Sequence, residues 1–374
     1  MAAWAGEYRV PLSAKSPKID GKFDPAEWEA SVGFDGFVRL NDGKLERRRA
    51  RGFIAADEEN IYVAILSQLP DEGELTAAVN VDSLKAVFDD SVEVYICPTP
   101  DLPDRVDYQF LVNSLGKGGY NIHKTGNPAE EVSWQGKWKS AHGQADGWWI
   151  CECAIPVASM GTVAKGRKTT DGVWTVNLTR NWKPDWGWTS LSGGYPNSGL
   201  RVVFTKEPAP SVRHECDGDP FMPPAAHRLA IANPGKQSLA LKAQMLLVRN
   251  NMPEIKEEKA LELAPGASDK VEIEISENDP TTQFDLTLRV TSANGQKIFY
   301  DRLVKWPRAK ELYRYVCGRP KDAPPVDFKF AYYPSKNKLR VFADVNGLPK
   351  DARLTELVGQ IRAQADKTVL KTIV

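Results

Sequence analysis

The sequence has little of what several common classes of protein require. Lysine plus arginine and aspartate plus glutamate are equal at 49 each, so the formal net charge is zero at pH 7. A chain without excess charge has no long-range field that attracts nucleic acid or an anionic membrane. No apolar run in the sequence approaches the ~20 residues of a membrane-spanning helix. We therefore expect neither a nucleic-acid partner nor a membrane span.

Catalytic and cofactor motifs are also scarce. The sequence has four scattered histidines, no Walker or Rossmann glycine pattern and no zinc-type pairing of cysteine with histidine. Met160 has no histidine at an obvious partner position, so haem is not expected. Asp89, Asp90 and Glu93 form a carboxylate cluster. A glycosidase pair must face each other across a cleft at ~5–10 Å, which two residues of one strand cannot do. The chain is therefore predicted to be non-catalytic.

The five cysteines are an odd number, so at least one is unpaired or pairs outside the chain. Cys151 and Cys153 alternate onto the same face of one strand and are poorly placed to bond each other. Cys97 ends a neighbouring candidate strand and is the candidate partner for one of them. Buried free thiols are the alternative.

What the sequence does contain is a series of short apolar runs separated by proline and glycine, which is typical of an all-β chain. Residues 61–66 are apolar on both faces, as expected of a central strand. Residues 91–96, 107–113 and 174–179 each alternate between apolar and hydrogen-bonding side chains. A β-sandwich packs the apolar face against its partner sheet and leaves the other face for solvent or a ligand.

Residues 19–28 are the most informative local motif. An Asp-Gly dipeptide within them predicts a turn, because glycine accepts a positive φ without steric cost. Asp24 is expected to cap a short helix, with Glu27 as the reciprocal carboxylate of a capping box. The side chain of Trp28 is then expected to point back toward the part of the protein that this single turn covers.

Four further segments follow this motif, each read as one strand with its turn: residues 57–64, 89–96, 147–156 and 174–180. In this order and spacing, the series resembles the family-nine carbohydrate-binding modules and the wider DOMON-like group of β-sandwiches. The resemblance covers about residues 8–206. It implies that the all-β chain begins with a jelly-roll or DOMON-like carbohydrate-binding sandwich.

Proline-rich stretches at residues 206–210 and 222–224 mark a linker, so we predict domains at residues 1–206, 207–308 and 309–374. Six candidate strands are expected in the second domain: residues 227–232, 239–248, 257–264, 270–276, 284–292 and 296–306. Short strands at this spacing suggest an immunoglobulin-like sandwich. Residues 214–219 have metal-ligand residue types without a recognised spacing and are interpreted as an acidic loop.

The third region is predicted to be a partial immunoglobulin-like β-domain. Strands are expected near residues 328–333 and 339–345, while residues 354–364 fit either a strand or an amphipathic helix. The sequence ends within apolar, strand-like residues 368–374, so we expect a truncated domain that lacks strands or borrows them.

Residues 181–188 carry three tryptophans, Trp182, Trp186 and Trp188. Their proline and glycine predict a loop, and a loop cannot easily bury three indoles. Exposed indoles stack on the flat C–H patches of sugar rings, while polar neighbours bind the hydroxyls. The resemblance implies that a sugar lies between two tryptophans, one of them from this loop, and Phe88 is the aromatic residue nearest the second position. Packing of the indoles against the second domain is the alternative.

Five polar residues are predicted to accompany these indoles: Glu93, Gln109, Asn113, Arg180 and Asn181. They lie on, or next to, the hydrogen-bonding strand faces, where the resemblance places ligand contacts. A solvated sheet face is the alternative.

The resemblance also implies structural calcium in an acidic loop. Asp57, Glu58 and Asn60 offer the oxygen ligands that Ca²⁺ prefers. A plain solvated turn is the alternative.

These expectations describe the non-catalytic N-terminal part of a secreted polysaccharide-active protein, which targets it to a polysaccharide or oligosaccharide. Residues 1–6 lead almost directly into the first strand, as in a mature secreted protein with an added start methionine. We therefore expect a secreted, periplasmic or cell-surface location. The alternatives are the N-terminal region of a glycoside hydrolase whose catalytic domain lies outside this chain, and a structural or adhesion protein without sugar binding.

Overall fold

The computed structural model describes residues 7–40, 42–69, 74–103, 105–124, 136–183, 187–194, 199–249, 253–275, 284–306, 327–333, 338–344, 359–362 and 369–373. Within these ranges the chain is built from strands, with three short 3₁₀ helices, η1 (Leu84–Phe88), η2 (Val157–Ser159) and η3 (Thr162–Ala164). The predicted all-β fold class is confirmed. No helix of the described ranges is both long and apolar enough to cross a membrane. The chain divides into two units, residues 1–312 and 313–374.

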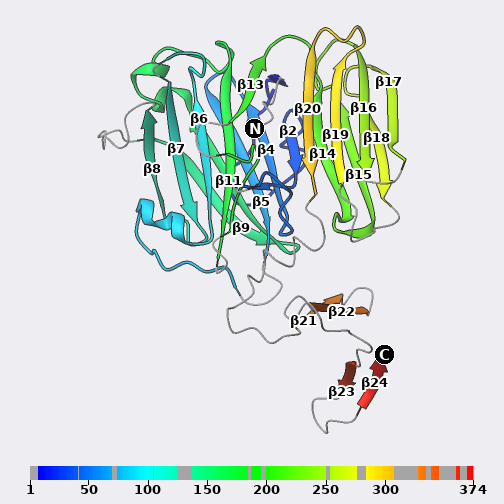
Figure 1. Cartoon of the computed structure of the whole chain (residues 1–374). Helices are drawn as coiled ribbons and strands as arrows, with labels where there is room; N and C mark the ends of the chain where they lie inside the picture. Colours follow the sequence, from blue (N-terminus) through cyan, green and yellow to red (C-terminus); the bar gives the residue numbers. More distant parts are fainter. Residues whose placement is uncertain are drawn as a thin grey trace. The chain divides into compact units, whose positions relative to one another are not determined.

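The first sheet of the larger unit supplies one layer of the N-terminal sandwich (Figure 1). Its strands run in the order β1 (Glu7–Pro11), β13 (Leu200–Thr205), β11 (Trp174–Trp182), β6 (Ser91–Cys97), β7 (Val106–Asn113) and β8 (Gly118–Lys124). Two short strands, β12 (Gly187–Ser190) and β3 (Val38–Arg39), extend it beside β11.

The second sheet provides the other layer and then continues into the following strands. Its order is β18 (Ser268–Ile275), β15 (Met222–Ala232), β14 (Ser211–Asp219), β2 (Val32–Asp35), β4 (Ala50–Ala56), β5 (Asn60–Gln68), β10 (Trp148–Pro156) and β9 (Lys139–Ala145). The pairing of β14 with β2 therefore carries one sheet across the boundary predicted at residue 206. Residues on both sides of it belong to the same compact unit.

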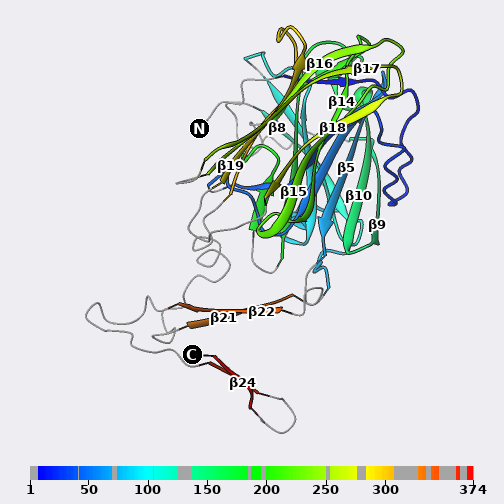
Figure 2. The same ribbon diagram turned by 90° about the vertical axis from the view of Figure 1, so that its right-hand side faces the viewer.

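A third sheet completes a second sandwich. It contains β17 (Ile255–Leu263), β16 (Leu239–Arg249), β19 (Phe284–Ser292) and β20 (Ile298–Lys305), and it packs on the β18–β15–β14 end of the second sheet (Figure 2). Seven strands in two layers of four and three match the immunoglobulin-like arrangement expected here. Each of the six strands predicted between residues 227 and 306 overlaps an observed strand.

The interpretation of residues 214–219 as an acidic loop is wrong, because they lie within β14. His214 and Cys216 face the interior, whereas Glu215 and Asp217 face outward and pair with Arg228 on β15. The acidic residues therefore form cross-strand ion pairs.

The predicted strand faces are confirmed on β6, β7 and β11. Their apolar residues all lie in one buried core: Val92, Val94, Ile96, Tyr108, Phe110, Val112, Trp174, Val176 and Leu178. Strand β5 is central, as expected. Its residues Ile61, Val63 and Ile65 join this core, while Tyr62, Ala64 and Leu66 join a second cluster on the opposite face of the sheet.

The motif at residues 19–28 covers that second cluster. Trp28 is fully buried in it, and its indole Nε1 donates to the Glu152 carboxylate at 3.3 Å. The same carboxylate accepts the backbone N–H of Gly21 at 2.9 Å. The expected helix is absent, since residues 25–30 form turns, and Glu27 pairs with Lys18 at 2.7 Å instead of completing a capping box.

The four cysteines in the described ranges, Cys97, Cys151, Cys153 and Cys216, are buried and free. The alternative of buried thiols is therefore correct for them, and the fifth cysteine lies outside the described residues.

The smaller unit contains two separate antiparallel pairs, β21 (Asp327–Tyr333) with β22 (Lys338–Asp344), and β23 (Gly359–Arg362) with β24 (Val369–Ile373). The two strands expected near residues 328–333 and 339–345 are present. Strand β23 lies within the segment that fitted either a strand or a helix. The predicted domain boundaries and the truncation stay predictions.

Replacing Trp28 with alanine should destabilise the chain by about 3–5 kcal/mol, because a fully buried indole is lost from the second cluster. Chemical denaturation of the full chain measures this change. Trp28→Phe should retain part of the packing and lose less. An unchanged unfolding midpoint for Trp28→Ala would show that this motif does not hold the sheet.

Candidate functional site

The outer face of the first sheet brings together most of the polar residues predicted from the sequence. Strand register aligns Trp188 of β12 with Asn181 of β11, Asn181 with Ser91 of β6, and Ser91 with Asn113 of β7. These four residues form a row across four strands, on the side of the sheet away from the core. We refer to this face, between β12 and β7, as the polar face.

Glu93 lies at the centre of the polar face and is fully buried. One carboxylate oxygen accepts Asn181 Nδ2 at 2.8 Å and Thr179 Oγ1 at 3.2 Å. The other accepts the Tyr95 hydroxyl at 2.9 Å and the amide of Gln109. One carboxylate thereby fixes side chains from three strands, so Glu93 and Gln109 form the floor of the face.

Two amide oxygens on this floor are buried without a hydrogen-bond donor, Oδ1 of Asn177 and Oδ1 of Asn181. The hydrogen-bond partners of the two side-chain amides determine how each amide is oriented. Asn181 Nδ2 faces the Glu93 carboxylate, and Asn177 Nδ2 faces the Gly194 carbonyl at 2.9 Å. Both partners only accept, so each amide must present its nitrogen to them and its oxygen elsewhere. Both oxygens are buried, so the polar face contains two unpaired acceptors beneath its accessible surface.

Asn113 has a different role from the one predicted. Its amide nitrogen donates to the Val79 carbonyl at 2.8 Å and to Asp89 at 2.9 Å. Its oxygen accepts the backbone N–H groups of Leu115 at 3.1 Å and Lys117 at 2.9 Å. Asn113 therefore joins the β7–β8 turn to the segment before β6, and its hydrogen-bonding capacity is used within the fold.

The predicted contact between Arg180 and a ligand on this face is contradicted by its direction. Arg180 has the same parity as the core residue Leu178, so its side chain lies between the sheets and is fully buried. It pairs with Asp90 at 2.8 Å and donates to Ser67 Oγ at 2.6 Å. Burial lowers the pKa of the Arg180 guanidinium to about 10.

Trp182 also lies inside, at 4% exposure, as the last residue of β11. Its indole donates to Thr189 Oγ1 at 3.1 Å, and the Arg180 guanidinium lies 4.1 Å from its ring centroid. Trp182 is therefore a core residue, and the segment predicted as one loop is partly strand. Trp186 lies outside the described residues.

Trp188 and Phe88 are the exposed aromatic residues beside the polar face. Trp188 is 41% exposed and Phe88 is 49% exposed. Trp188 lies at one end of the row formed by Trp188, Asn181, Ser91 and Asn113. Phe88 is the last residue of η1 and precedes Ser91, a member of that row, by three positions in the sequence. The assignment of these two residues as an aromatic pair around a sugar stays a prediction.

The residues predicted to bind calcium form a closed turn. Asp57 accepts the backbone N–H groups of Glu59 at 2.8 Å and Asn60 at 2.7 Å, together with the Tyr62 hydroxyl at 2.5 Å. Glu58 pairs with two lysines, which lower the pKa of its carboxyl to about 2. Among the described residues, no cluster of three His, Cys, Asp or Glu side chains fits a metal, so calcium has no support there.

The interior also contains a cavity of about 10 Å³, lined by residues that include Asp35, Arg49, His214, Cys216 and His227. This volume is near the minimum for one water molecule. The cavity is too small for a sugar, and the polar face is the candidate site.

No protein-family model matches the sequence, and no curated protein matches it. Similar solved structures include a candidate carbohydrate-binding protein from Bacteroides uniformis, with 17% identity and a TM-score of 0.39, covering 54% of this chain and 98% of that protein. A DUF4785 family protein from Legionella pneumophila has 9% identity and a TM-score of 0.20, covering 71% of this chain and 58% of that protein. β-Glucuronidase 2 from Bacteroides uniformis has 7% identity and a TM-score of 0.22, covering 76% of this chain but 29% of the enzyme. At these values the likenesses assign no function to this chain.

Glu93→Gln should destabilise the chain by about 1–3 kcal/mol, because the new amide turns a donor toward groups that donate to Glu93. Thermal and chemical denaturation measure the loss. Asp101→Asn is the matched control, since this exposed carboxylate pairs only with the partly exposed Arg201 among the described residues and contributes little. Equal stability of the two variants would contradict the organising role of Glu93.

Proposed function

We propose that the polar face binds an oligosaccharide or polysaccharide without catalysis. The observation that carries this proposal is the alignment of exposed Trp188 with Asn181 and Ser91 in one row. Ligand sites typically combine aromatic surface with a few placed polar groups. An exposed indole such as that of Trp188 stacks on the C–H face of a sugar ring.

The carboxylates near this face have partners within the fold. Asp90 pairs with Arg180, and Asp89 accepts the backbone N–H groups of Ala78 at 2.9 Å and Val79 at 3.0 Å. Glu93 is held by side chains on three strands. These engagements favour structural roles for the acidic residues over acid–base catalysis, and therefore support binding alone.

The resemblance to family-nine modules extends the proposal. A DOMON-like binding module at the N-terminus would target a secreted, periplasmic or cell-surface polysaccharide-active protein to its substrate. A screen of the full chain on a glycan array tests this role. If the folded chain binds no glycan, the structural or adhesion alternative gains support.

Trp188→Ala should weaken glycan binding roughly 30-fold, because an aromatic anchor of a binding site contributes ~2 kcal/mol or more and ~1.4 kcal/mol is tenfold. Stability should change little, since Trp188 is largely exposed. Calorimetric titration with the best glycan from the array measures the affinity.

Two matched variants complete this test. Leu102→Ala removes an apolar side chain that is also exposed, beyond the opposite end of β6, and should leave binding unchanged. Trp182→Ala should instead lower stability by ~3–5 kcal/mol as a core truncation. Wild-type affinity in Trp188→Ala would place the site elsewhere.

A further inference from the structure

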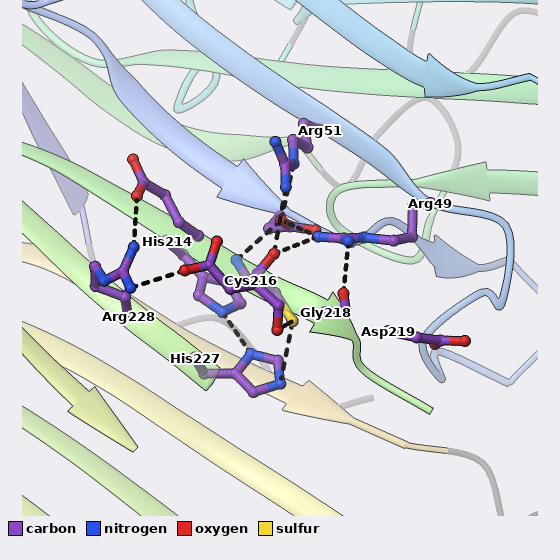
Figure 3. Close-up of polar contacts among 12 residues, drawn as sticks. Arg49, Arg51, His214, Cys216, Gly218, Asp219, His227 and Arg228 are labelled. Atoms are coloured by element: carbon purple, nitrogen blue, oxygen red, sulfur yellow. Dashed lines mark hydrogen bonds and ion pairs between the residues drawn. The ribbon is translucent and has the colours of Figure 1, made fainter. Parts of the chain in front are cut away.

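Two buried histidines meet where the second sandwich joins the first. His214 of β14 is 3% exposed and His227 of β15 is 2% exposed, and their rings stack with centroids 5.3 Å apart. Cys216 lies directly across from His227 in the β14–β15 register. Figure 3 shows the three side chains pointing toward one another, beside Arg49 and Arg51.

The hydrogen-bond partners determine where each ring carries its proton. Arg302 Nη1 lies 3.3 Å from His214 Nδ1, and arginine can only donate, so Nδ1 accepts. His214 therefore carries its proton on Nε2, which lies 3.0 Å from His227 Nδ1. His227 Nδ1 must accept as well, which puts the His227 proton on Nε2, 3.7 Å from Cys216 Sγ.

The result is a one-way chain of hydrogen bonds from Arg302 through His214 and His227 to Cys216. We call these four residues the histidine relay. The Cys216 thiol continues the chain toward the Asp217 carbonyl at 3.8 Å. Every ring nitrogen has a partner, and each relay histidine is held in its neutral form.

An additional proton has no favourable position in the relay. On His214 it must occupy Nδ1, which faces the guanidinium of Arg302. On His227 it must occupy Nδ1, which faces the Nε2–H group of His214. In both cases an acceptor becomes a donor opposite another donor, so the chain must break where the proton enters.

The charges around the relay do not compensate for such a proton. Asp35 of β2 is already paired with Arg49 at 2.6 Å and Arg51 at 2.9 Å, and Arg302 of β20 adds a third guanidinium. Glu46 also lines the cavity beside the rings. Burial, followed by the neighbouring histidine and arginines, lowers the pKa of His214 well below its usual value. Burial lowers the pKa of His227 to about 4.

The relay also holds two parts of the fold together. Arg302 donates to the Asp35 carbonyl at 2.9 Å and to the Gly36 carbonyl, which links β20 to the end of β2. Nearby, the Tyr300 hydroxyl donates to the Gly33 carbonyl at 3.2 Å, and the Leu45 N–H donates to the Lys305 carbonyl at 2.7 Å. Loss of the His214 acceptor would disturb the arginine at the centre of this junction.

We propose that the histidine relay is an acid-sensitive lock between the second sandwich and the N-terminal sandwich. The junction is closed at neutral pH and opens when the histidines take up protons.

Proton linkage determines whether a lower pH opens or closes the junction. An opened junction exposes histidines with ordinary pKa values of about 6.5, so the open state binds more protons than the closed state below that pH. The closed state is therefore fully favoured above about pH 6.5 and loses stability as the pH falls toward 4. For two histidines, lowering the pH from 7 to 5 should raise the opening equilibrium on the order of several hundredfold.

Hydrogen exchange of the full chain, followed by mass spectrometry at pH 7 and pH 5 and corrected for intrinsic rates, tests this proposal. Between pH 7 and pH 5, the protection of peptides from β14, β15 and β20 should fall on the order of several hundredfold. Peptides from β5 and β10 should keep their protection. The double variant His214→Gln/His227→Gln should show no pH dependence at the junction. His142→Gln, at an exposed position, should behave as the wild type.

A second measurement does not depend on the variants folding. Nitrogen NMR of the ¹⁵N-histidine-labelled wild type should show two rings with the proton on Nε2 that stay neutral from pH 8 to pH 5. Equal loss of protection across all strands of the larger unit would overturn the lock, because the histidines would then act only on global stability. Junction protection that is independent of pH, or buried rings with the proton on Nδ1, would overturn it as well.

Discussion

The alternation of side chains along β11 is the constraint on which both the core and the candidate site depend. The strand sends Trp174, Leu178 and Trp182 into the interior and turns Asn177 and Asn181 outward. A slip of one residue would exchange the two sets. Pairing with β6 and β12 then aligns the outward residues with Glu93 and Trp188. The polar face is thus the reverse side of a packed layer, and repacking the interior would displace it.

Much of this arrangement could be predicted from local sequence. The period of two identified the strands and separated apolar from polar faces. The same period also placed Arg180 inside, two residues after Leu178, but its charge favoured an assignment to the ligand. Trp182 shares that parity, but the proline and glycine that follow it predict a loop. In both cases residue type and position in the strand predict different locations, and the structure follows position in the strand.

Other features depend on which distant strands become neighbours, which local patterns do not specify. Glu152 holds the motif at residues 19–28 from more than 120 positions away in the sequence. The histidine relay requires the register of β14 on β15 and the approach of Arg302 from β20. His214 and Cys216 stand among acidic residues, which locally predict a loop, and only pairing with β15 makes their segment a strand.

The pairing of β2 with β14 has a consequence for modularity. Ser31 accepts a hydrogen bond from Ser211, 180 positions later, and the Cys216 N–H donates to Asp35. A fragment that ended near residue 206 would leave β2 as an open sheet edge, which can pair with other chains. The N-terminal sandwich is therefore not interchangeable by itself. The smallest unit for grafting onto another protein would extend through β20 and its contacts with β2.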